Sequence, residues 1–315
     1  MSLCCCEKCF YAGRFCLYIC PVATDIRKYA FRPSAQPQIE VVPLEQLTAA
    51  SSPYLVVPHR TEFYHVFLFE DCHPTHTVDF NAIGIRPFSL LFIDKERVHQ
   101  FDRLLKYTGC VLVFTDSFFC TTDSDARFLR SSILFNGIND NGVLQPGKAV
   151  FDNCMSICSQ ISSELQQETD AGQPFILKNY LHNFLLLAER EKRKQGFSGS
   201  SKGPDLEYAV LFKDLLDQHF TDKKQVSFYA GKLHVSEKRL GQATAKISGR
   251  TPKELISDRI LLEAKRLLVH GSQSVKEIGF ALGFEEPTNF IKFFRKLAGQ
   301  TPALFRDSQL PRIRS

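Results

Sequence analysis

Two copies of one short unit lie end to end in the last third of the chain. The first copy contains the run Lys-Ile-Ser-Gly-Arg-Thr-Pro-Lys-Glu-Leu over residues 246–255, and the second contains Lys-Leu-Ala-Gly-Gln-Thr-Pro-Ala-Leu-Phe over residues 296–305. The correspondence continues upstream over residues 230–240 and 279–290, with one extra residue in the turn of the second copy. A repeat of this kind defines the structural unit, which is here predicted to be a helix, a tight turn and a second helix.

The predicted helices have recognisable start and stop signals. Ser236 is a suitable N-cap for the second helix of the first copy, Gly249 suits its C-terminal end, and Pro252 suits the first turn of the helix that follows. We expect helices over residues 205–219, 227–234, 236–248, 252–269, 275–282 and 287–298. The helix over 252–269 would connect the two copies.

The second helix of each copy combines an apolar stripe with a polar and basic face. That face comprises Lys238, Arg239, Gln242, Thr244 and Lys246 in the first copy, and Thr288, Asn289, Lys292, Arg295 and Lys296 in the second. Gln and Asn can read adenine through two hydrogen bonds, and Lys can donate to guanine. Lys and Arg near helix ends more often hold phosphates. The alternative is that both are ordinary solvated helix faces, and the repeat argues against it.

Positive charge is concentrated in the same segment. Residues 205–315 carry 19 Lys and Arg against 13 Asp and Glu, whereas the other 204 residues carry 20 against 21. Such a balance suits a segment that meets phosphates. The composition, 44% hydrophobic and 23% charged, is typical of a soluble globular protein. No run approaches the ~18 apolar residues of a spanning helix. We expect double-stranded DNA as a partner and no membrane association.

The first half of the chain has the period of β-strands. Runs rich in β-branched and aromatic residues are separated by Pro, Asp, Asn and Gly, and they cover residues 54–57, 62–69, 76–80, 87–93 and 110–114. Residues 80–84 suit a hairpin turn. This spacing predicts a small barrel or jelly roll over residues 29–148.

The period changes to that of helices at about residue 150. Two amphipathic helices are expected over residues 149–190, where they would form a dimer surface or cap the barrel. Residues 191–204 are charged and then rich in Gly and Ser, which predicts a flexible linker. Residues 205–315 then form the helical DNA-binding domain. The expected fold class is therefore multidomain α+β.

The cysteines indicate a reducing compartment. Six of the 11 lie within the first 20 residues, and none follows Cys158, so no disulfide framework spans the chain. We expect a cytoplasmic protein, with residues 1–28 forming a poorly ordered, Cys-rich leader. Cys6, Cys9, Cys16 and Cys20 have spacing that loosely suits zinc, which is the alternative for this segment.

One stretch of the second copy carries a family resemblance. Ile-Gly-Phe-Ala-Leu-Gly-Phe over 278–284, Asn-Phe-x-x-Phe-Phe-Arg-Lys over 289–296 and Gly-x-Thr-Pro-x-x-x-Arg over 299–306 resemble the signature of the AraC/XylS family of bacterial transcription regulators. The resemblance covers roughly residues 205–307. It implies two helix-turn-helix units that bind DNA, an N-terminal cupin-like barrel that binds a small-molecule effector, and helices that form a homodimer. An activator of this kind would also contact RNA polymerase.

The resemblance also assigns base contacts. They correspond to Lys238 and Gln242 in the first unit, and to Thr288, Asn289 and Lys292 in the second. Gly241 departs from the family pattern because a longer polar side chain often occupies its position, and Pro287 falls where the helix usually begins with a polar residue. These departures predict fewer base contacts from the first unit.

The barrel has three possible roles. The effector candidates are His59, Phe63, His65, Phe67 and His99, in a pocket for an uncharged or weakly polar molecule. Three His and a carboxylate such as Glu62, with His73 and His76 nearby, could instead form the metal site of a cupin enzyme. Against that, a His-x-His pair is absent, and His59 and His65 would lie roughly 20 Å apart on one regular strand. A scaffold that binds nothing is the third possibility. We expect no catalytic residues, metal or cofactor.

Overall fold

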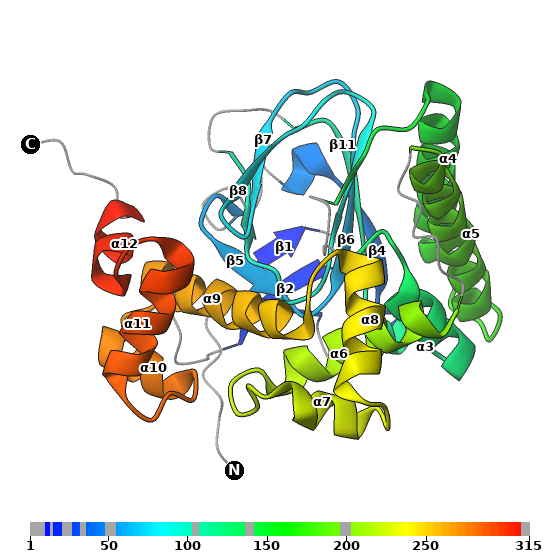
Figure 1. Cartoon of the computed structure of the whole chain (residues 1–315). Helices are drawn as coiled ribbons and strands as arrows, with labels where there is room; N and C mark the ends of the chain where they lie inside the picture. The colour runs from blue at the N-terminus through cyan, green and yellow to red at the C-terminus, as the bar shows by residue number, and fades with distance from the viewer. Residues whose placement is uncertain are drawn as a thin grey trace, which may run out of the picture. The chain divides into compact units, whose positions relative to one another are not determined.

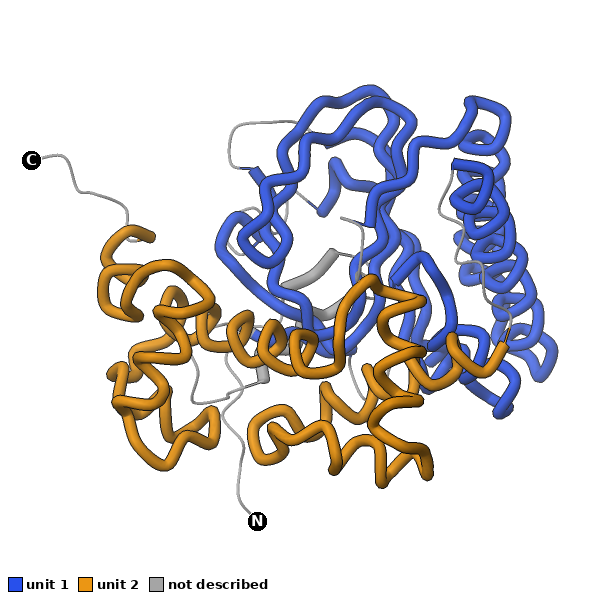
Figure 2. Tube along the Cα trace, in the orientation of Figure 1, with its two compact units in different colours: residues 1–22, 27–199 blue, residues 23–26, 200–315 orange. Residues whose placement is uncertain are grey.

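The computed structural model describes residues 10–12, 15–20, 27–31, 36–47, 55–102, 107–135, 142–195 and 203–309. The chain divides into two compact units, one of residues 1–22 and 27–199 and one of residues 23–26 and 200–315 (Figures 1 and 2). The division at residues 199 and 200 falls within the segment 191–204 that we predicted to be a linker.

Two β-sheets form the N-terminal unit. One has the strand order β1-β2-β3-β5-β10-β7-β8 and the other β12-β9-β6-β11-β4. Among the described residues, all the strand pairs are antiparallel except β3 with β5. The strands are β1 (Phe10–Ala12), β2 (Phe15–Cys20), β3 (Arg27–Ala30), β4 (Ile39–Pro43), β5 (His59–Thr61), β6 (Tyr64–Phe69), β7 (Thr75–Val78), β8 (Asn81–Gly84), β9 (Ser89–Ile93), β10 (His99–Gln100), β11 (Gly109–Phe114) and β12 (Val143–Leu144).

Strand β6 contributes to two separate cores because its side chains alternate between the faces of the sheet. Phe67 and Phe69 lie in a cluster with residues of both sheets, including Tyr29 of β3. Val66 and Leu68 lie in a second cluster, with residues of the helices that cover the other face of this sheet. Every residue of β6 is buried. This explains why the run is mostly apolar, with His65 as its buried polar residue, instead of alternating with exposed polar residues.

The expected barrel differs from the observed sheets in its closure and in two strands. The described strands form two distinct sheets, so they do not close into one barrel. Residues 55–57 form no strand. The hairpin expected near residues 80–84 is present, but its turn is Asp79-Phe80, both with positive φ, and residues 81–84 form strand β8. Positive φ at both central residues is the geometry of the tight two-residue hairpin.

A pair of long helices packs on the sheet that contains β6. They are α4 (Lys148–Leu165) and α5 (Gln173–Lys194), preceded by the short helices α2 (Asp116–Phe119) and α3 (Asp123–Ser131). Buried residues of α4 and α5 share one core with β6, β9 and β11. Helix α5 extends to Lys194, so residues 191–194 are helical instead of linker. The remaining linker residues 196–202 lie outside the described residues.

The segment 1–28 contains strands where we predicted a poorly ordered leader. Strands β1 and β2 pair with each other, and β2 pairs with β3, which in turn lies parallel to β5. Residues 1–9, 13–14 and 21–26 lie outside the described residues. The sequence signal was misleading because clustered cysteines and scattered charges obscured the short apolar runs.

The C-terminal unit is all helical, as predicted. Its helices are α6 (Pro204–His219), α7 (Val226–Lys232), α8 (Glu237–Ser248), α9 (Pro252–His270), α10 (Val275–Ala281), α11 (Pro287–Ala298) and α12 (Pro302–Gln309). The predicted caps are confirmed: the Ser236 side chain accepts a hydrogen bond from the Arg239 amide, and Gly249 and Gly299 end α8 and α11 with φ of 70° and 74°. Side-chain caps and left-handed glycines satisfy backbone groups that the helix cannot.

Helix α9 connects two hydrophobic cores within this unit. Ile256 and Ile260 near its start pack with residues of α6, α7 and α8. Leu267 and Leu268 near its end pack with residues of α10, α11 and α12. Phe220 and Phe284 pack against both clusters. The two repeat copies are therefore joined by a shared helix and by contacts between their cores.

Candidate nucleic-acid interface and internal cavity

The two helix-turn-helix units have the same backbone hydrogen bonds at their turns. The Val235 amide donates to the Ala230 carbonyl at 3.0 Å in the first unit, and the Phe284 amide donates to the Gly279 carbonyl at 3.0 Å in the second. The turn residue between them has positive φ in both, 54° at His234 and 70° at Gly283. The repeat seen in the sequence is thus a repeat of backbone geometry, and α8 and α11 are the second helices of the two units.

Helix α8 buries one stripe and exposes the opposite one. Leu240 and Ala243 are fully buried in the core of the first unit. Lys238 and Gln242, one turn apart, are exposed. Two predicted reading residues of the first unit therefore lie on the solvent face of its second helix.

Thr244 lies in the core, so its assignment to the reading face was wrong. It is 1% exposed, and its hydroxyl donates to the Gly241 carbonyl at 3.2 Å. Its position in the repeat is that of Phe294, which is 0% exposed. The equivalence with Phe294 was the sequence signal that could have placed Thr244 in the protein core. A small polar residue can be buried there when its hydroxyl forms a hydrogen bond with the backbone of its own helix.

Arg239 and Lys246 are engaged with a carboxylate on another helix. Arg239 Nη1 pairs with Asp205 Oδ1, and Lys246 Nζ lies 2.8 Å from Asp205 Oδ2. The Arg239 guanidinium also lies over the Tyr208 ring, 5.0 Å from its centroid. Asp205 has no distinctive signal in the sequence, because a lone acid at the start of a helix is typical of a residue that stabilises the helix dipole.

Helix α11 buries aromatic side chains on one face and exposes polar and basic side chains on the other. Phe290 and Phe294 are fully buried. The five predicted residues are all exposed: Thr288, Asn289, Lys292, Arg295 and Lys296. In the described part of the chain, none of the three cations among them forms an ion pair. The second unit therefore presents more unpaired positive charge on its second helix than the first.

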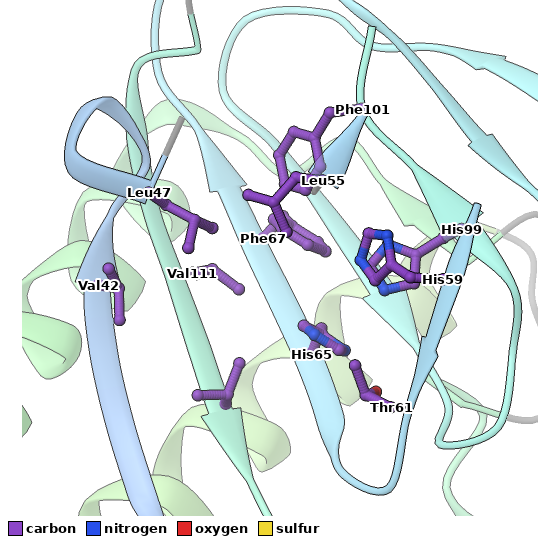
Figure 3. A pocket seen from close by; sticks show the side chains of 11 residues that line it. Val42, Leu47, Leu55, His59, Thr61, His65, Phe67, His99, Phe101 and Val111 are labelled. Atoms are coloured by element: carbon purple, nitrogen blue, oxygen red, sulfur yellow. The ribbon is translucent and has the colours of Figure 1, made fainter. Parts of the chain in front are cut away.

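A small cavity lies inside the N-terminal unit (Figure 3). Its volume is about 20 Å³, enough for a single water molecule. Its lining is mostly apolar, with three His and one Thr among the side chains. The lining residues are Val42, Leu47, Leu55, His59, Thr61, His65, Phe67, His99, Phe101, Val111 and Val113.

Three buried histidines gather around a fourth, His99. Its ring centroid lies 4.3 Å from that of His59, 4.8 Å from that of His65 and 5.4 Å from that of His76. The Nε2 atom of His76 lies 3.2 Å from Nδ1 of His99, a hydrogen bond between the two rings. Among the described residues, Nδ1 of His65 and Nε2 of His99 are buried without a hydrogen-bond partner.

Burial keeps three of these imidazoles neutral. Burial, together with a smaller effect of the neighbouring His59, lowers the pKa of His76 to about 3. Burial, with repulsion from the other histidines, also lowers the pKa values of His65 and His99 well below the usual range. Burial disfavours the charged imidazolium, and a positive neighbour does the same.

The cavity contains four of the five effector candidates. His59, His65, Phe67 and His99 line it, whereas Phe63 does not and packs edge-on against Phe31. Our argument that His59 and His65 lie roughly 20 Å apart was wrong, because they stand on different strands, β5 and β6, instead of one regular strand.

The metal site considered from the sequence is not assembled. Glu62 and His73 are exposed, and Glu62 pairs with Lys28 at 3.0 Å. The described residues contain no group of three or more His, Cys, Asp or Glu that could hold a metal ion. No helix among the described residues is both long and apolar enough to cross a membrane.

Comparison with known proteins gives sequence matches in the C-terminal unit and over most of the chain. Residues 229–308 match the family described as "Helix-turn-helix domain". The chain is 32% identical over 107 residues to the bifunctional transcriptional activator/DNA repair enzyme AdaA of Bacillus subtilis, a match that covers 34% of this chain and 51% of that protein. It thus spans about half the length of this relative.

A second relative matches over most of the chain. The HTH-type transcriptional activator RhaS of Pectobacterium carotovorum is 22% identical over 256 residues, covering 81% of this chain and 88% of that protein. Among solved structures, ToxT from Vibrio cholerae aligns with 14% identity and a TM-score of 0.39, covering 86% of this chain and 98% of that one.

Two helix-turn-helix units with exposed basic second helices, matched by transcriptional activators, define a DNA-binding transcription regulator. The matched residues include the signature over residues 278–306 that the sequence analysis singled out. The match agrees with the resemblance of the C-terminal unit to the AraC/XylS family of transcription regulators.

Proposed function

We propose that α8 and α11 each enter the major groove of DNA and read bases with their exposed polar faces. The main support is that each of these helices exposes polar side chains on the face opposite its fully buried stripe. The exposed residues are Lys238 and Gln242 on α8, and Thr288, Asn289 and Lys292 on α11. These residue types match the donors and acceptors of base edges. Arg295 and Lys296, in the last turn of α11, are placed to hold phosphates.

The connecting helix supports the reading of two groove segments by one protomer. Helix α9 has 19 residues, and at 1.5 Å per residue it is roughly 28 Å long. Successive major-groove segments on one face of DNA lie about 34 Å apart. A rigid helix of this length, packed into both cores, suits two recognition helices spaced by about one turn of duplex.

The helix pair of the N-terminal unit serves as the homodimer surface in this proposal. Helix α5 exposes three large apolar side chains, with Phe175 at 70%, Leu186 at 44% and Ile176 at 40% exposure. Such side chains on one helix favour contact with a second copy. Two protomers would then bind two sites on the same DNA.

The histidine cavity is the proposed effector site, in a cupin-like fold. Its support is the pair of buried nitrogens, His65 Nδ1 and His99 Nε2, that have no partner among the described residues. A buried polar atom without a partner costs free energy that a hydrogen-bonding ligand recovers. Neutral imidazoles and Thr61 among apolar walls suit a small uncharged molecule with hydroxyl or carbonyl groups. Such a molecule exceeds the present volume, so binding requires lining side chains to move.

Effector binding would then change how the N-terminal unit restrains the DNA-binding unit through the linker. An activator of this kind works in the cytoplasm and contacts RNA polymerase while bound to DNA. We assign no enzymatic role to the chain, and the N-terminal unit is the sensor.

The DNA part of this proposal is tested by hydroxyl-radical footprinting of the full chain on a selected binding site. We expect two protected groove segments about one turn apart for each protomer, with Gln242→Ala weakening one segment and Lys292→Ala the other. Protection of a single segment, or loss of both segments with either variant, would reject the two-helix reading.

The effector part is tested by thermal unfolding of the full chain with a panel of sugars and small metabolites, and with a chelator. A ligand that binds only the native state raises the melting temperature by mass action. A rise with one compound that His99→Ala removes supports the sensor. A fall in melting temperature with the chelator would favour the metal site, and no shift with any compound would favour the scaffold.

A further inference from the structure

Asp205 joins the start of the DNA-binding unit to its first recognition helix. It lies in the first turn of α6, and its carboxylate contacts two cations of α8 at once. Arg239 bonds to one oxygen and Lys246 to the other. The two cations stand seven residues apart on α8, so they lie two turns apart along one side of that helix. One carboxylate therefore bridges two turns of the recognition helix.

The carboxylate binds the two cations by the kind of contact that a DNA phosphate could also make. Arg and Lys bind carboxylate and phosphate oxygens by the same charge-assisted hydrogen bonds. The Asp205 side chain is only 17% exposed, and the stacking of Arg239 on Tyr208 holds the guanidinium toward α6. Hydrogen bonds from Lys246 and Arg239 lower the pKa of the Asp205 carboxyl, so it stays charged at neutral pH.

The second unit has no equivalent contact among the described residues. Lys296 occupies the repeat position of Lys246, is exposed, and forms no ion pair in that part of the chain. The two recognition helices thus differ in the charge that they offer to DNA. The difference has two sources: α6 supplies the carboxylate of Asp205, and the repeat position of Arg239 on α11 holds the uncharged Asn289.

We propose that Asp205 is a positioning residue that withholds Arg239 and Lys246 from DNA phosphates. Asp205 thereby limits sequence-independent DNA binding by the first unit. Lys238 and Gln242 then remain as the residues of α8 that contact bases. The inference rests on the proposed function, in which α8 enters the groove.

The test compares Asp205→Asn with wild type in the full chain, by measuring the affinity for mixed-sequence duplex at several salt concentrations. Each added phosphate contact steepens the slope of log K against log [salt] by about 0.9. Asp205→Asn is expected to steepen it by about 0.9 to 1.8, to tighten mixed-sequence binding severalfold at low salt, and to lower the ratio of specific to mixed-sequence affinity.

Asp217→Asn is the matched control. Asp217 also lies on α6 and pairs with an arginine of another helix, Arg259, at 2.7 Å, and Arg259 keeps a second partner in Glu263. The change in charge is the same, but the recognition helix is not involved, so the slope should stay at the wild-type value. An equal steepening in both variants would show a general charge effect and overturn the inference.

A second variant distinguishes release of the cations from a change in folding. Adding Arg239→Gln and Lys246→Gln to Asp205→Asn should return the slope to the wild-type value. An unchanged slope in Asp205→Asn, or a steepened one that survives the added substitutions, overturns the inference. Failure of the proposed function is a different result, namely wild-type protein that binds DNA with no sequence preference.

Discussion

Gly279 of α10 and Phe290 of α11 lie in direct contact. A Cβ atom added at Gly279 would come within 3.2 Å of the Phe290 Cβ and 3.3 Å of its ring. The same repeat positions in the first unit hold Ala230 and Leu240, both buried in one core. The second unit thus has a smaller residue on its first helix and a larger residue on its second helix than the first unit has. The two changes compensate, so the two helices can pack closely in both units.

Gly279→Ala should destabilise the C-terminal unit in spite of the better helix propensity of Ala. Ala gains about 1 kcal/mol in a helix interior, but overpacking a filled core typically costs 1–3 kcal/mol. The Phe290 ring cannot easily retreat, because it contacts the rings of Phe284 and Phe294. Urea unfolding of the full chain, followed by amide exchange in α10 and α11, measures the effect.

The double variant Gly279→Ala with Phe290→Leu copies the pair found in the first unit, and it should recover most of the lost stability. Gly241→Ala is a control for propensity alone, since a Cβ there meets no atom within 4 Å. It should stabilise the unit by up to about 1 kcal/mol. An equal increase in the free energy of unfolding for Gly279→Ala and Gly241→Ala would contradict the prediction that Gly279 is closely packed against Phe290.

His234→Gly should stabilise the first helix-turn-helix unit. His234 is an exposed residue with φ of 54°, a left-handed conformation that costs a non-glycine residue roughly 1–2 kcal/mol. Glycine also adds entropy to the unfolded chain, so we expect a net gain of about 0.5–1 kcal/mol. Amide exchange of α7 and α8 under urea measures it.

Gly283→Ala provides the opposite test in the second unit. Gly283 has φ of 70°, and a Cβ there would lie 2.0 Å from the Thr221 carbonyl oxygen, so the variant should lose stability. Stabilisation by Gly283→Ala, or a loss with His234→Gly, would mean that the shared turn geometry does not govern these positions.

Acidification should destabilise the N-terminal unit through its buried histidines. The folded-state pKa of His76 is about 3, and those of His65 and His99 are also depressed, whereas an unfolded chain binds these protons near pH 6.5. Below that pH the unfolded state holds more protons, so stability falls as pH drops from about 6.5 towards 3. Each histidine contributes up to about 1.4 kcal/mol per pH unit.

Amide exchange in β6 and β7 as a function of pH measures this loss. His76→Gln should reduce the slope of stability against pH by the contribution of up to one proton. His73→Gln should leave that slope unchanged because His73 is exposed. Protection of β6 that stays constant between pH 6.5 and 4 would contradict the assignment of neutral, buried imidazoles.

Lys292→Ala should weaken binding to the cognate DNA site by about 1–3 kcal/mol and relax preference at one base position. The reason is that Lys292 is exposed near the middle of the α11 reading face and forms no ion pair within the described residues. Lys296→Ala, in the last turn of α11, should instead weaken binding to all sequences alike. Binding to a library of single-base variants separates the two. A uniform loss for Lys292→Ala would make it a phosphate contact.

Much of the C-terminal unit could be predicted from the sequence because its signals are local. Helix caps such as Ser236 and Gly249 mark the helix boundaries. The repeat also allows each position in one copy to be compared with the equivalent position in the other. Thr244 was misplaced because polarity was taken as exposure, although its repeat partner Phe294 is buried. Asp205 was missed because its partners are 34 and 41 residues away, and no local pattern reports such a contact.

The N-terminal unit was predicted less well because its sheets depend on distant pairing. His59, His65 and His99 come from three different strands, and only strand order brings them together. The spacing of His59 and His65 along the chain suggested wide separation of these two. The strands near the N-terminus were missed for the same reason, since β3 is stabilised by pairing with β5, about thirty residues away.

The most direct test of the central claim is selection of genomic DNA fragments by the full chain at two salt concentrations, with sequencing of the retained DNA. The account predicts an enriched motif with two reading segments about one helical turn apart, retained at the higher salt. Retention without any motif, lost at the higher salt, would mean binding by charge alone and would contradict sequence-specific regulation.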